Sequence, residues 1–193
     1  MKASEAWSPD ELLTRARAGE AAAFAALVRR YQRTVYSIAL RMLSDRHRAE
    51  DLAQEVFLQL YRSLDSIASD AHLAFWLRKV AVNRSIDRIR QETRYDSEPL
   101  TEAAAIIDET LDADPLLERR MSDLVAQLPP AARAVVVLRY QEDLDPVDIA
   151  STLDMSINTV KSHLKRSLTS LRARVLGAAL VDEVQPNMSE PSR

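Results

Sequence analysis

The stretch that decides the fold is residues 145–175, DPVDIASTLDMSINTVKSHLKRSLTSLRARV. Asp145 is followed by Pro146 and, three residues on, by Asp148, which is the pattern of a helix start. The pattern predicts a short helix over 146–153, a turn of about three residues, and a longer helix that Ser156 caps. Apolar residues at helical spacing would hold the longer helix to its partners: Val160, Leu164, Leu168, Leu171 and Val175. The stretch is therefore predicted to be a helix-turn-helix.

The other face of the longer helix is polar and basic. Residues 156–176 carry five basic groups and no acidic group. The major groove of DNA admits one helix, whose first turns reach the base edges, and a helix N-terminus favours phosphate. The alternative is an ordinary solvated surface on a bundle helix. We expect duplex DNA to be bound by the residues along this face: Ser156, Asn158, Thr159, Lys161, Ser162, His163, Lys165 and Arg166.

The net charge of the 193-residue chain is −3, which at first argues against DNA binding. The charge is unevenly distributed, however. Residues 1–91 carry 15 basic and 11 acidic groups, 92–115 carry 1 and 8, 116–176 carry 9 and 7, and 177–193 carry 1 and 3. The acidity thus lies largely in 92–115, which also contains Pro99 and lacks a continuous apolar face. We interpret 92–115 as an acidic flexible linker between two modules.

The predicted fold is all-α, because the chain has only two glycines and is rich in alanine, leucine and arginine. The first module, residues 8–91, begins with a helix start at Ser8-Pro9. Apolar periodicity predicts further helices over about 24–42, 47–63 and 73–91, with a loop over 65–72. The second module, residues 116–176, would add helices over 116–128 and 130–140 before the helix-turn-helix. We expect the tail, 177–193, to be disordered.

A second basic segment lies at the end of the first module. Residues 76–90, WLRKVAVNRSIDRIR, place five basic groups around one apolar stripe, with Phe75 and Trp76 at the start. Basic groups interleaved with aromatic rings suit single-stranded nucleic acid, whose bases stack and whose phosphates need neutralising. The alternative is that the two aromatic residues belong to the core and the arginines to an ordinary surface.

Other classes of protein fit the sequence less well. The chain has no cysteine, its three histidines are scattered, and it lacks a glycine-rich phosphate loop, so we expect no enzyme, metal site or cofactor. A stand-alone helix-turn-helix regulator would need an effector domain in front, yet residues 1–91 show no strand pattern. A pure adaptor protein would not need the basic face. No secretory signal or membrane-spanning run is visible.

Four groups of motifs, in order, resemble the sigma-70 family of bacterial RNA polymerase sigma factors. The first, DLAQEVF at 51–57, is similar to the polymerase-binding helix of region 2. The second, FWL at 75–77 with VAVN at 80–83 and DRIR at 87–90, is similar to the promoter-melting and −10 segment. The third group, LP at 128–129 with LRY at 138–140, and the fourth, DIA at 148–150 with TVKS at 159–162, resemble region 4. With no room for a region 3 domain and no region 1.1, the architecture resembles the extracytoplasmic-function (ECF) subgroup.

The resemblance implies binding to core RNA polymerase. The DLAQEVF-type helix would dock on a coiled coil of the largest subunit, and region 4 on the flap. The outward contacts would be Asp51, Gln54, Glu55 and Leu58, with a salt bridge from Arg62. Such factors are commonly held by an anti-sigma factor, so we expect such a partner, no membrane insertion and a cytoplasmic location.

The resemblance also assigns the DNA contacts. Asn83 and a loop containing Ser66, Ser69 and Asp70 would form a pocket for a flipped −10 base, beside Trp76, while Arg78, Lys79, Arg84 and Arg88 hold phosphates. The basic face of 156–175 would recognise the −35 element as duplex. Asn158 and His163 stand where glycine and arginine are frequent, which bears on the −35 sequence. The linker, at most ~80 Å long when extended, would lie in a positively charged channel of the polymerase.

Overall fold

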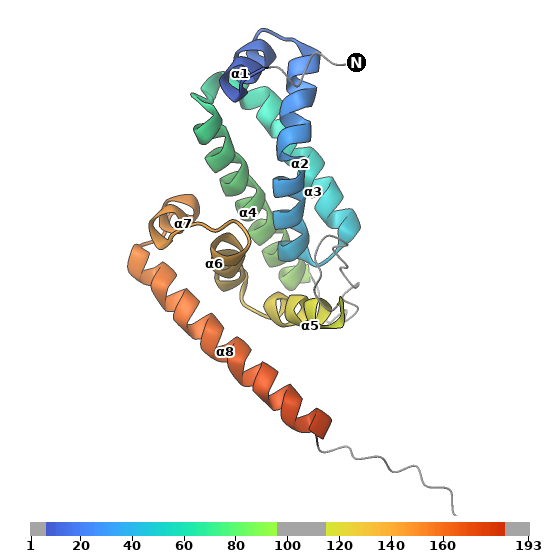
Figure 1. Ribbon diagram of the computed structural model, residues 1–193, viewed down its shortest axis with the longest axis vertical. Helices are drawn as coiled ribbons and strands as arrows, with labels where there is room; N and C mark the ends of the chain where they lie inside the picture. Colours follow the sequence, from blue (N-terminus) through green and yellow to red (C-terminus); the bar gives the residue numbers. More distant parts are fainter. Residues whose placement is uncertain (1–6, 96–114, 184–193) are drawn as a thin grey trace, which may run out of the picture.

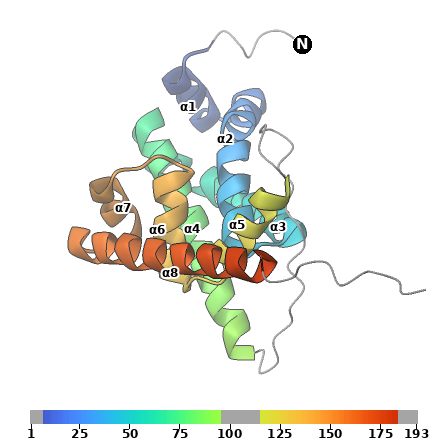
Figure 2. The same cartoon turned by 60° about the horizontal axis from the view of Figure 1, so that its bottom comes forward.

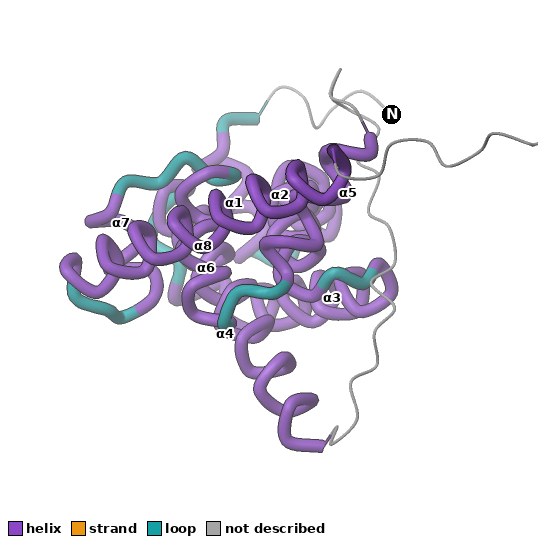
Figure 3. The backbone as a smooth tube through the Cα atoms, turned by 90° about the horizontal axis from the view of Figure 1, so that it is seen from below, coloured by secondary structure: helices purple, strands orange, loops and turns teal. Residues whose placement is uncertain are grey.

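The computed structural model describes residues 7–95 and 115–183, and these residues form helices and loops without a strand (Figures 1 and 3). The all-α prediction is therefore confirmed for this part of the chain. The elements are α1 (Pro9–Arg17), α2 (Ala21–Leu43), α3 (Arg46–Ser63), the short 3-10 helix η1 (Leu64–Ser66), α4 (Asp70–Tyr95), α5 (Pro115–Ala126), α6 (Pro130–Tyr140), α7 (Pro146–Leu153) and α8 (Ile157–Glu183). Most of the predicted linker and the end of the tail lie outside the described residues.

Local capping explains where several helices begin. The Ser8 side chain accepts a hydrogen bond from Glu11 N, and the Glu11 carboxylate accepts one from Ser8 N, so that α1 starts with a capping box. The hydrogen bond from Ser8 N, followed by the interaction with the Ser8 side chain, lowers the pKa of the Glu11 carboxyl group. Asp145 caps α7 by accepting from Val147 N and Asp148 N. These caps satisfy amides that the first turn of a helix leaves without partners.

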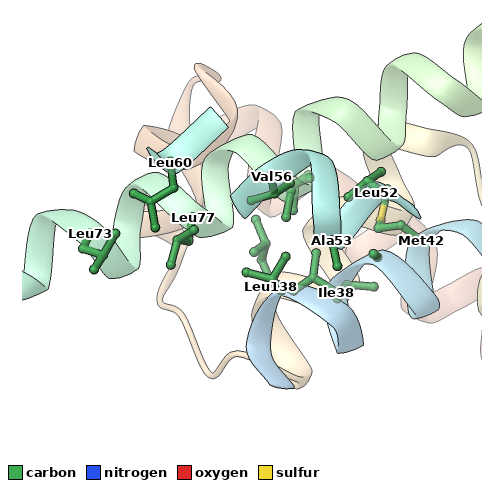
Figure 4. Close-up of a cluster of buried hydrophobic side chains, with 14 of the residues drawn as sticks. Ile38, Met42, Leu52, Ala53, Val56, Leu60, Leu73, Leu77 and Leu138 are labelled. Carbon is green, nitrogen blue, oxygen red and sulfur yellow. The ribbon is translucent and has the colours of Figure 1, made fainter. Parts of the chain in front are cut away.

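The first module is built around α2, which packs against α1, α3 and α4 (Figure 1). Its buried face carries Leu27, Val35, Ile38 and Met42, all fully buried. Leucines from α3 and α4 complete this core, as Figure 4 shows for Leu52, Leu60, Leu73 and Leu77. Burial of one such side chain stabilises the fold by about 1.5–3 kcal/mol relative to an exposed one.

The second module consists of α5–α8, and α7 with the first part of α8 forms the predicted helix-turn-helix. Asp154 has a φ of 52°, the left-handed conformation that ends α7 and turns the chain into α8. Val160 and Leu171 are buried, whereas Leu164 and Leu168 are half-buried. Val175, predicted to face inward, is 43% exposed, because α8 runs past the helices that it packs against (Figure 1).

The two modules pack against each other, which the sequence did not predict. Helix α6 lies between α8 on one side and α2 and α4 on the other (Figures 1 and 2). Leu138 of α6 belongs to the same buried cluster as Ile38 of α2 (Figure 4). Arg133 of α6, only 9% exposed, donates from Nη1 to the carbonyl oxygen of Met42 at 2.5 Å. Gln141 Nε2 donates to Ser37 Oγ at 2.9 Å. One continuous core therefore crosses the boundary.

Several helices are longer than predicted. Helix α4 starts at Asp70, inside the predicted loop 65–72, of which η1 takes a further part. It ends at Tyr95, inside the predicted linker. Helix α8 continues to Glu183, so that residues 177–183 of the tail predicted to be disordered are helical. The alanine and leucine of 178–180 favour helix, and one glycine costs only about 1 kcal/mol.

Candidate functional site

The first candidate site is an open groove of about 910 Å³ between α3 and α4, here called the basic groove. It is lined by Glu55, Gln59, Phe75, Trp76, Lys79, Val80, Asn83, Arg84, Asp87, Arg88 and Gln91. Trp76 and Asn83 are seven residues apart, about two helical turns, and therefore share one face of α4. The groove thus combines a ring that can stack, an amide that can donate and accept, and three cationic side chains.

A network of ion pairs and hydrogen bonds connects the two walls of the basic groove. Glu55 on α3 contacts two arginines of α4, with 3.0 Å from Oε2 to Arg84 Nη1 and 2.6 Å from Oε1 to Arg88 Nη2. Arg84 Nε donates to Gln59 Oε1 at 2.9 Å, and Arg88 Nη1 donates to the carbonyl oxygen of Arg48 at 3.0 Å. Sequence reasoning did not identify Gln59 or this network.

The other two cations predicted on α4 are engaged by the second module. Arg78 Nε donates to Glu142 Oε2 at 2.9 Å, and Lys79 Nζ lies 2.9 Å from Asp154 of the α7–α8 turn. Lys79 Nζ also lies 5.9 Å from the centre of the Phe75 ring, within the range of a cation–π interaction. Arg78 does not line the basic groove, whereas Lys79 does.

The loop residues predicted to read the −10 base lie between the end of η1 and the start of α4. Asp70 N donates to Asp10 Oδ1 at 3.0 Å, and Tyr31 donates its hydroxyl to Asp70 Oδ1 at 2.5 Å. Ser66 donates to the carbonyl oxygen of Ser63, while Ser69 Oγ accepts from the amide of residue 72. Asn83 follows Asp70 by 13 residues on one continuous helix, about 20 Å along its axis. The structure thus does not bring Asn83 and these three residues into one pocket.

Tyr31, next to Asp70, has a strongly shifted pKa. Burial and the hydrogen bond to Asp70 raise the pKa of the Tyr31 hydroxyl to about 12. The Asp70 carboxylate is also 3.6 Å from the Arg30 guanidinium. Asp70 is therefore held by two residues of α2 at the point where α4 begins.

A second groove, also of about 910 Å³, lies between α2 and α3 and is mainly apolar. We call it the apolar groove; it is lined by Phe24, Val28, Gln32, Arg33, Tyr36, Glu50, Ala53, Gln54, Phe57, Leu58 and Tyr61. Leu58 is 58% and Tyr61 60% exposed, and the rings of Phe24 and Tyr61 meet edge to face at 5.2 Å. Exposed large apolar side chains that gather in one groove are typical of a surface that binds another protein.

The residues predicted to bind polymerase divide between the two faces of α3. Asp51, Gln54, Leu58 and Arg62 are exposed, and Gln54 and Leu58 line the apolar groove. Glu55 instead lines the basic groove. Sequence reasoning missed the contribution of Tyr36, Phe57 and Tyr61 to the apolar groove. Their signal was their size at positions off the inner stripe of α2 and α3.

The third site is a hollow of about 300 Å³ at the start of α8, lined by Asn158, Thr159, Ser162, His163 and Arg166. Ser156 Oγ accepts from Thr159 N at 3.0 Å and caps the helix as predicted. Lys161 and Lys165 are exposed beside these residues. The polar and basic side chains predicted to contact duplex DNA therefore share the free face of α8.

Neither a metal site nor a membrane span is found in the part of the chain that the structure describes. Within 7–95 and 115–183, no group of three acidic or histidine side chains is placed to hold a metal ion. None of the helices in these ranges is both long and apolar enough to cross a membrane.

The structure combines a helix-turn-helix with a second helical module that carries a basic and an apolar groove. This combination indicates a DNA-binding protein that acts in transcription. Family models identify both halves: "Sigma-70 region 2" matches residues 27–95, and "Sigma-70, region 4" matches 118–171. The chain is 32% identical over 170 residues to the ECF RNA polymerase sigma factor SigW of Bacillus subtilis, covering 81% of this chain and 91% of SigW. It is 30% identical over 170 residues to SigK of Mycobacterium sp. (strain KMS), covering 84% and 88%. The chain belongs to the ECF group of the sigma-70 family of sigma factors, and a stand-alone regulator is not favoured.

Two solved structures share the fold. The sigma factor RpoE of Bartonella quintana, in complex with the anti-sigma factor NepR, superposes with a TM-score of 0.65 at 20% identity and covers 78% of this chain and 94% of RpoE. CnrH, in complex with the cytosolic domain of CnrY, superposes with a TM-score of 0.62 at 22% identity and covers 92% and 99%. The helical arrangement is thus shared with both solved structures, of which RpoE is a sigma factor.

Proposed function

We propose that this sigma factor binds core RNA polymerase through the apolar groove, recognises −35 duplex DNA with α8, and opens the −10 element in the basic groove. The observation that carries the proposal is the position of Asn83 beside Trp76 in a groove with three cations. A ring can stack on an unpaired base, an amide can read a base edge, and cations neutralise the phosphates of the strand. Such a groove suits an opened strand.

For the polymerase contact, the exposed face of α3 supplies Asp51, Gln54, Leu58 and Arg62 next to the apolar groove. Leu58 would bury its side chain on binding, and the charged residues would form the rim. The contact would be with a coiled coil of the largest subunit, and region 4 would reach the flap. By the same proposal the chain works in the cytoplasm, where polymerase and promoter DNA meet, and catalyses no reaction itself.

For the −10 contact, Asn83 and the loop residues would serve different nucleotides. Asn83, Trp76, Lys79, Arg84 and Arg88 would hold a base and its neighbouring phosphates in the basic groove. Asp70, about 20 Å from Asn83 along α4, would contact the strand farther on, together with Ser66 and Ser69, which precede the helix.

For the −35 contact, the free face of α8 would enter the major groove. Asn158 can pair bidentately with adenine, and one good bidentate contact is worth about 1–3 kcal/mol of discrimination. Ser156, Thr159, Ser162 and His163 would contact bases or phosphates near the helix start, and Lys161, Lys165 and Arg166 the phosphates.

An anti-sigma factor is the proposed regulatory partner. RpoE and CnrH, which share the fold, are each seen with a partner protein, in RpoE's case an anti-sigma factor. In promoter-bound complexes the acidic linker would span the distance between the two modules.

Reconstitution with core polymerase tests the proposal. We expect a stable complex and run-off transcription from promoters selected out of a random pool. In Asn83→Ala, core binding is retained and strand opening, followed by permanganate reactivity of unpaired thymines, is impaired. Gln127→Ala, which removes an exposed amide outside the grooves, is the matched control. Absence of a complex with core contradicts the polymerase proposal, and normal opening by Asn83→Ala contradicts the −10 assignment.

A further inference from the structure

The Glu55 carboxylate stands in a groove whose three cationic side chains favour negatively charged strands. It forms one contact to each of two arginines that are one helical turn apart on α4, at 3.0 Å for Arg84 and 2.6 Å for Arg88. A carboxylate in this position repels phosphate and therefore lowers the affinity of the groove for any nucleic acid. A contribution of Glu55 to strand recognition would therefore have to come from something other than attraction of the strand.

Orientation is the contribution that the contacts supply. A guanidinium has five N–H donors in one plane. Arg84 uses one donor on Glu55 and one on Gln59, and Arg88 uses one on Glu55 and one on the Arg48 carbonyl. Two contacts on different nitrogens fix the plane of each guanidinium, and its remaining donors then have defined directions.

We propose that Glu55 is a positioning residue for single-strand recognition, which holds Arg84 and Arg88 so that their free N–H groups meet the strand next to Asn83. The inference rests on the proposed −10 function of the basic groove. It gives Glu55 a role on DNA, although its motif resembles a polymerase-binding helix. The lining of the two grooves supports this role, because Gln54 and Leu58 line the apolar groove and Glu55 does not.

The chain offers a matched control in Asp87. Asp87 is exposed, lines the same groove and carries the same charge, but it is not a partner in the contacts that hold Arg84 and Arg88. Glu55→Gln and Asp87→Asn therefore remove one negative charge each from the same groove. Only the first also removes a hydrogen-bond acceptor from the arginine pair, because the side-chain nitrogen of glutamine cannot accept from a guanidinium.

The experiment uses the reconstituted holoenzyme and two single-stranded oligodeoxynucleotides: the −10 strand of a selected promoter, and a shuffled strand of the same composition. The measured quantity is the ratio of the two dissociation constants. We expect Glu55→Gln to lower this discrimination about fivefold, the size that an ordinary exposed ion pair can support. Asp87→Asn should tighten the binding of both strands and leave the ratio unchanged, and both variants should bind core polymerase as the wild type does.

Two outcomes overturn the inference. If each variant changes the dissociation constants of the two strands by the same factor, so that the ratio stays constant in both, Glu55 acts through charge alone. If Glu55→Gln loses core binding, Glu55 is a polymerase contact. A wild-type holoenzyme that does not distinguish the strands overturns the proposed function itself, which is a separate result.

A second variant covers the case in which Glu55→Gln perturbs folding. Arg88→Lys keeps the charge but lacks the planar fork that Glu55 and the Arg48 carbonyl hold. It should lower discrimination by a similar factor, and the double variant should lower it no further, because both changes disrupt one unit. If the double variant lost discrimination by the product of the two single factors, the positioning role would be contradicted.

Discussion

Arg78 of the first module and Glu142 of the second form an ion pair across the boundary, with 2.9 Å between Nε and Oε2. The Glu142 side chain is only 8% exposed and that of Arg78 26%. Next to it, Lys79 pairs with Asp154 at 2.9 Å. In this arrangement two cations that the sequence predicts to hold promoter phosphates already have carboxylate partners, so that a DNA strand would have to compete with the second module for them.

Removal of the Glu142 charge should therefore increase binding of single-stranded DNA by the free protein. In Glu142→Gln, Arg78 becomes available for a phosphate, and the logarithm of the binding constant should depend more steeply on salt, by about 0.7 per freed cation. Fluorescence anisotropy with a labelled oligothymidylate at several salt concentrations measures the slope. Glu20→Gln, which breaks the exposed pair with Arg15, is the control. An unchanged slope for Glu142→Gln means that Arg78 does not reach the strand.

Arg133→Met should stabilise the protein. Burial, together with the nearby Arg48 charge, lowers the pKa of Arg133 to about 10, which marks the cost of keeping this guanidinium at the boundary. Replacement of a buried charge by an apolar side chain of similar length is often stabilising, and we expect the free energy of unfolding to rise by about 1 kcal/mol. Arg133→Ala should lower it by about 2 kcal/mol, because it leaves a cavity. Urea denaturation followed by circular dichroism measures both, and a large loss of stability in Arg133→Met would contradict the prediction.

Leu58→Asp should abolish most of the affinity for core polymerase without destabilising the chain. Leu58 is 58% exposed in the apolar groove, so a charge there costs little in the free protein but would be buried by the proposed polymerase contact. We expect the dissociation constant to rise at least about tenfold, in line with a central contact of an interface. Leu176→Asp, at a similarly exposed leucine of α8, is the control. If both variants lost affinity for core polymerase equally, the loss would be a general effect of the added charge and not of the apolar groove.

Tyr31→Phe should remove a tyrosine that ionises late. Because the pKa of Tyr31 is raised to about 12, the folded state keeps its proton after the unfolded state has lost it. The stability that this proton contributes is complete below pH 10 and is lost as the pH rises from about 10 to about 12. Ultraviolet titration of tyrosinate should show a late component in the wild type and in Tyr140→Phe, whose ring is 61% exposed, but not in Tyr31→Phe. A late component that persists in Tyr31→Phe assigns it to another residue.

The sequence predicted best what is decided within one helical turn. Asp145 and Pro146 start α7 at the expected residue, because a cap acts on the amides that immediately follow it. The start of α4 was missed, because Asp70 is held by Asp10 and Tyr31, which are distant in sequence. The end of α8 was placed at the last residue of the apolar stripe, whereas the helix continues beyond its packing partners.

The candidate site follows the same division. The two-turn spacing of Trp76 and Asn83 was enough to place them on one face of α4. The pairing of Glu55 with Arg84 and Arg88 depends on how α3 lies against α4, which no local pattern specifies. The packing of the modules depends on pairs such as Arg78 and Glu142, which are 64 residues apart, and so it could not be predicted.

Arg133 has a further consequence for the free energy that holds the two modules together. Its Nε has no hydrogen-bond partner among the described residues, and its guanidinium is held mainly by one carbonyl oxygen at the end of α2. Any separation of the modules would return this guanidinium to water, and its hydration would offset part of the free energy of the apolar contact that is lost. A partner that takes the modules apart would therefore need to supply less free energy than the loss of the apolar contact alone requires.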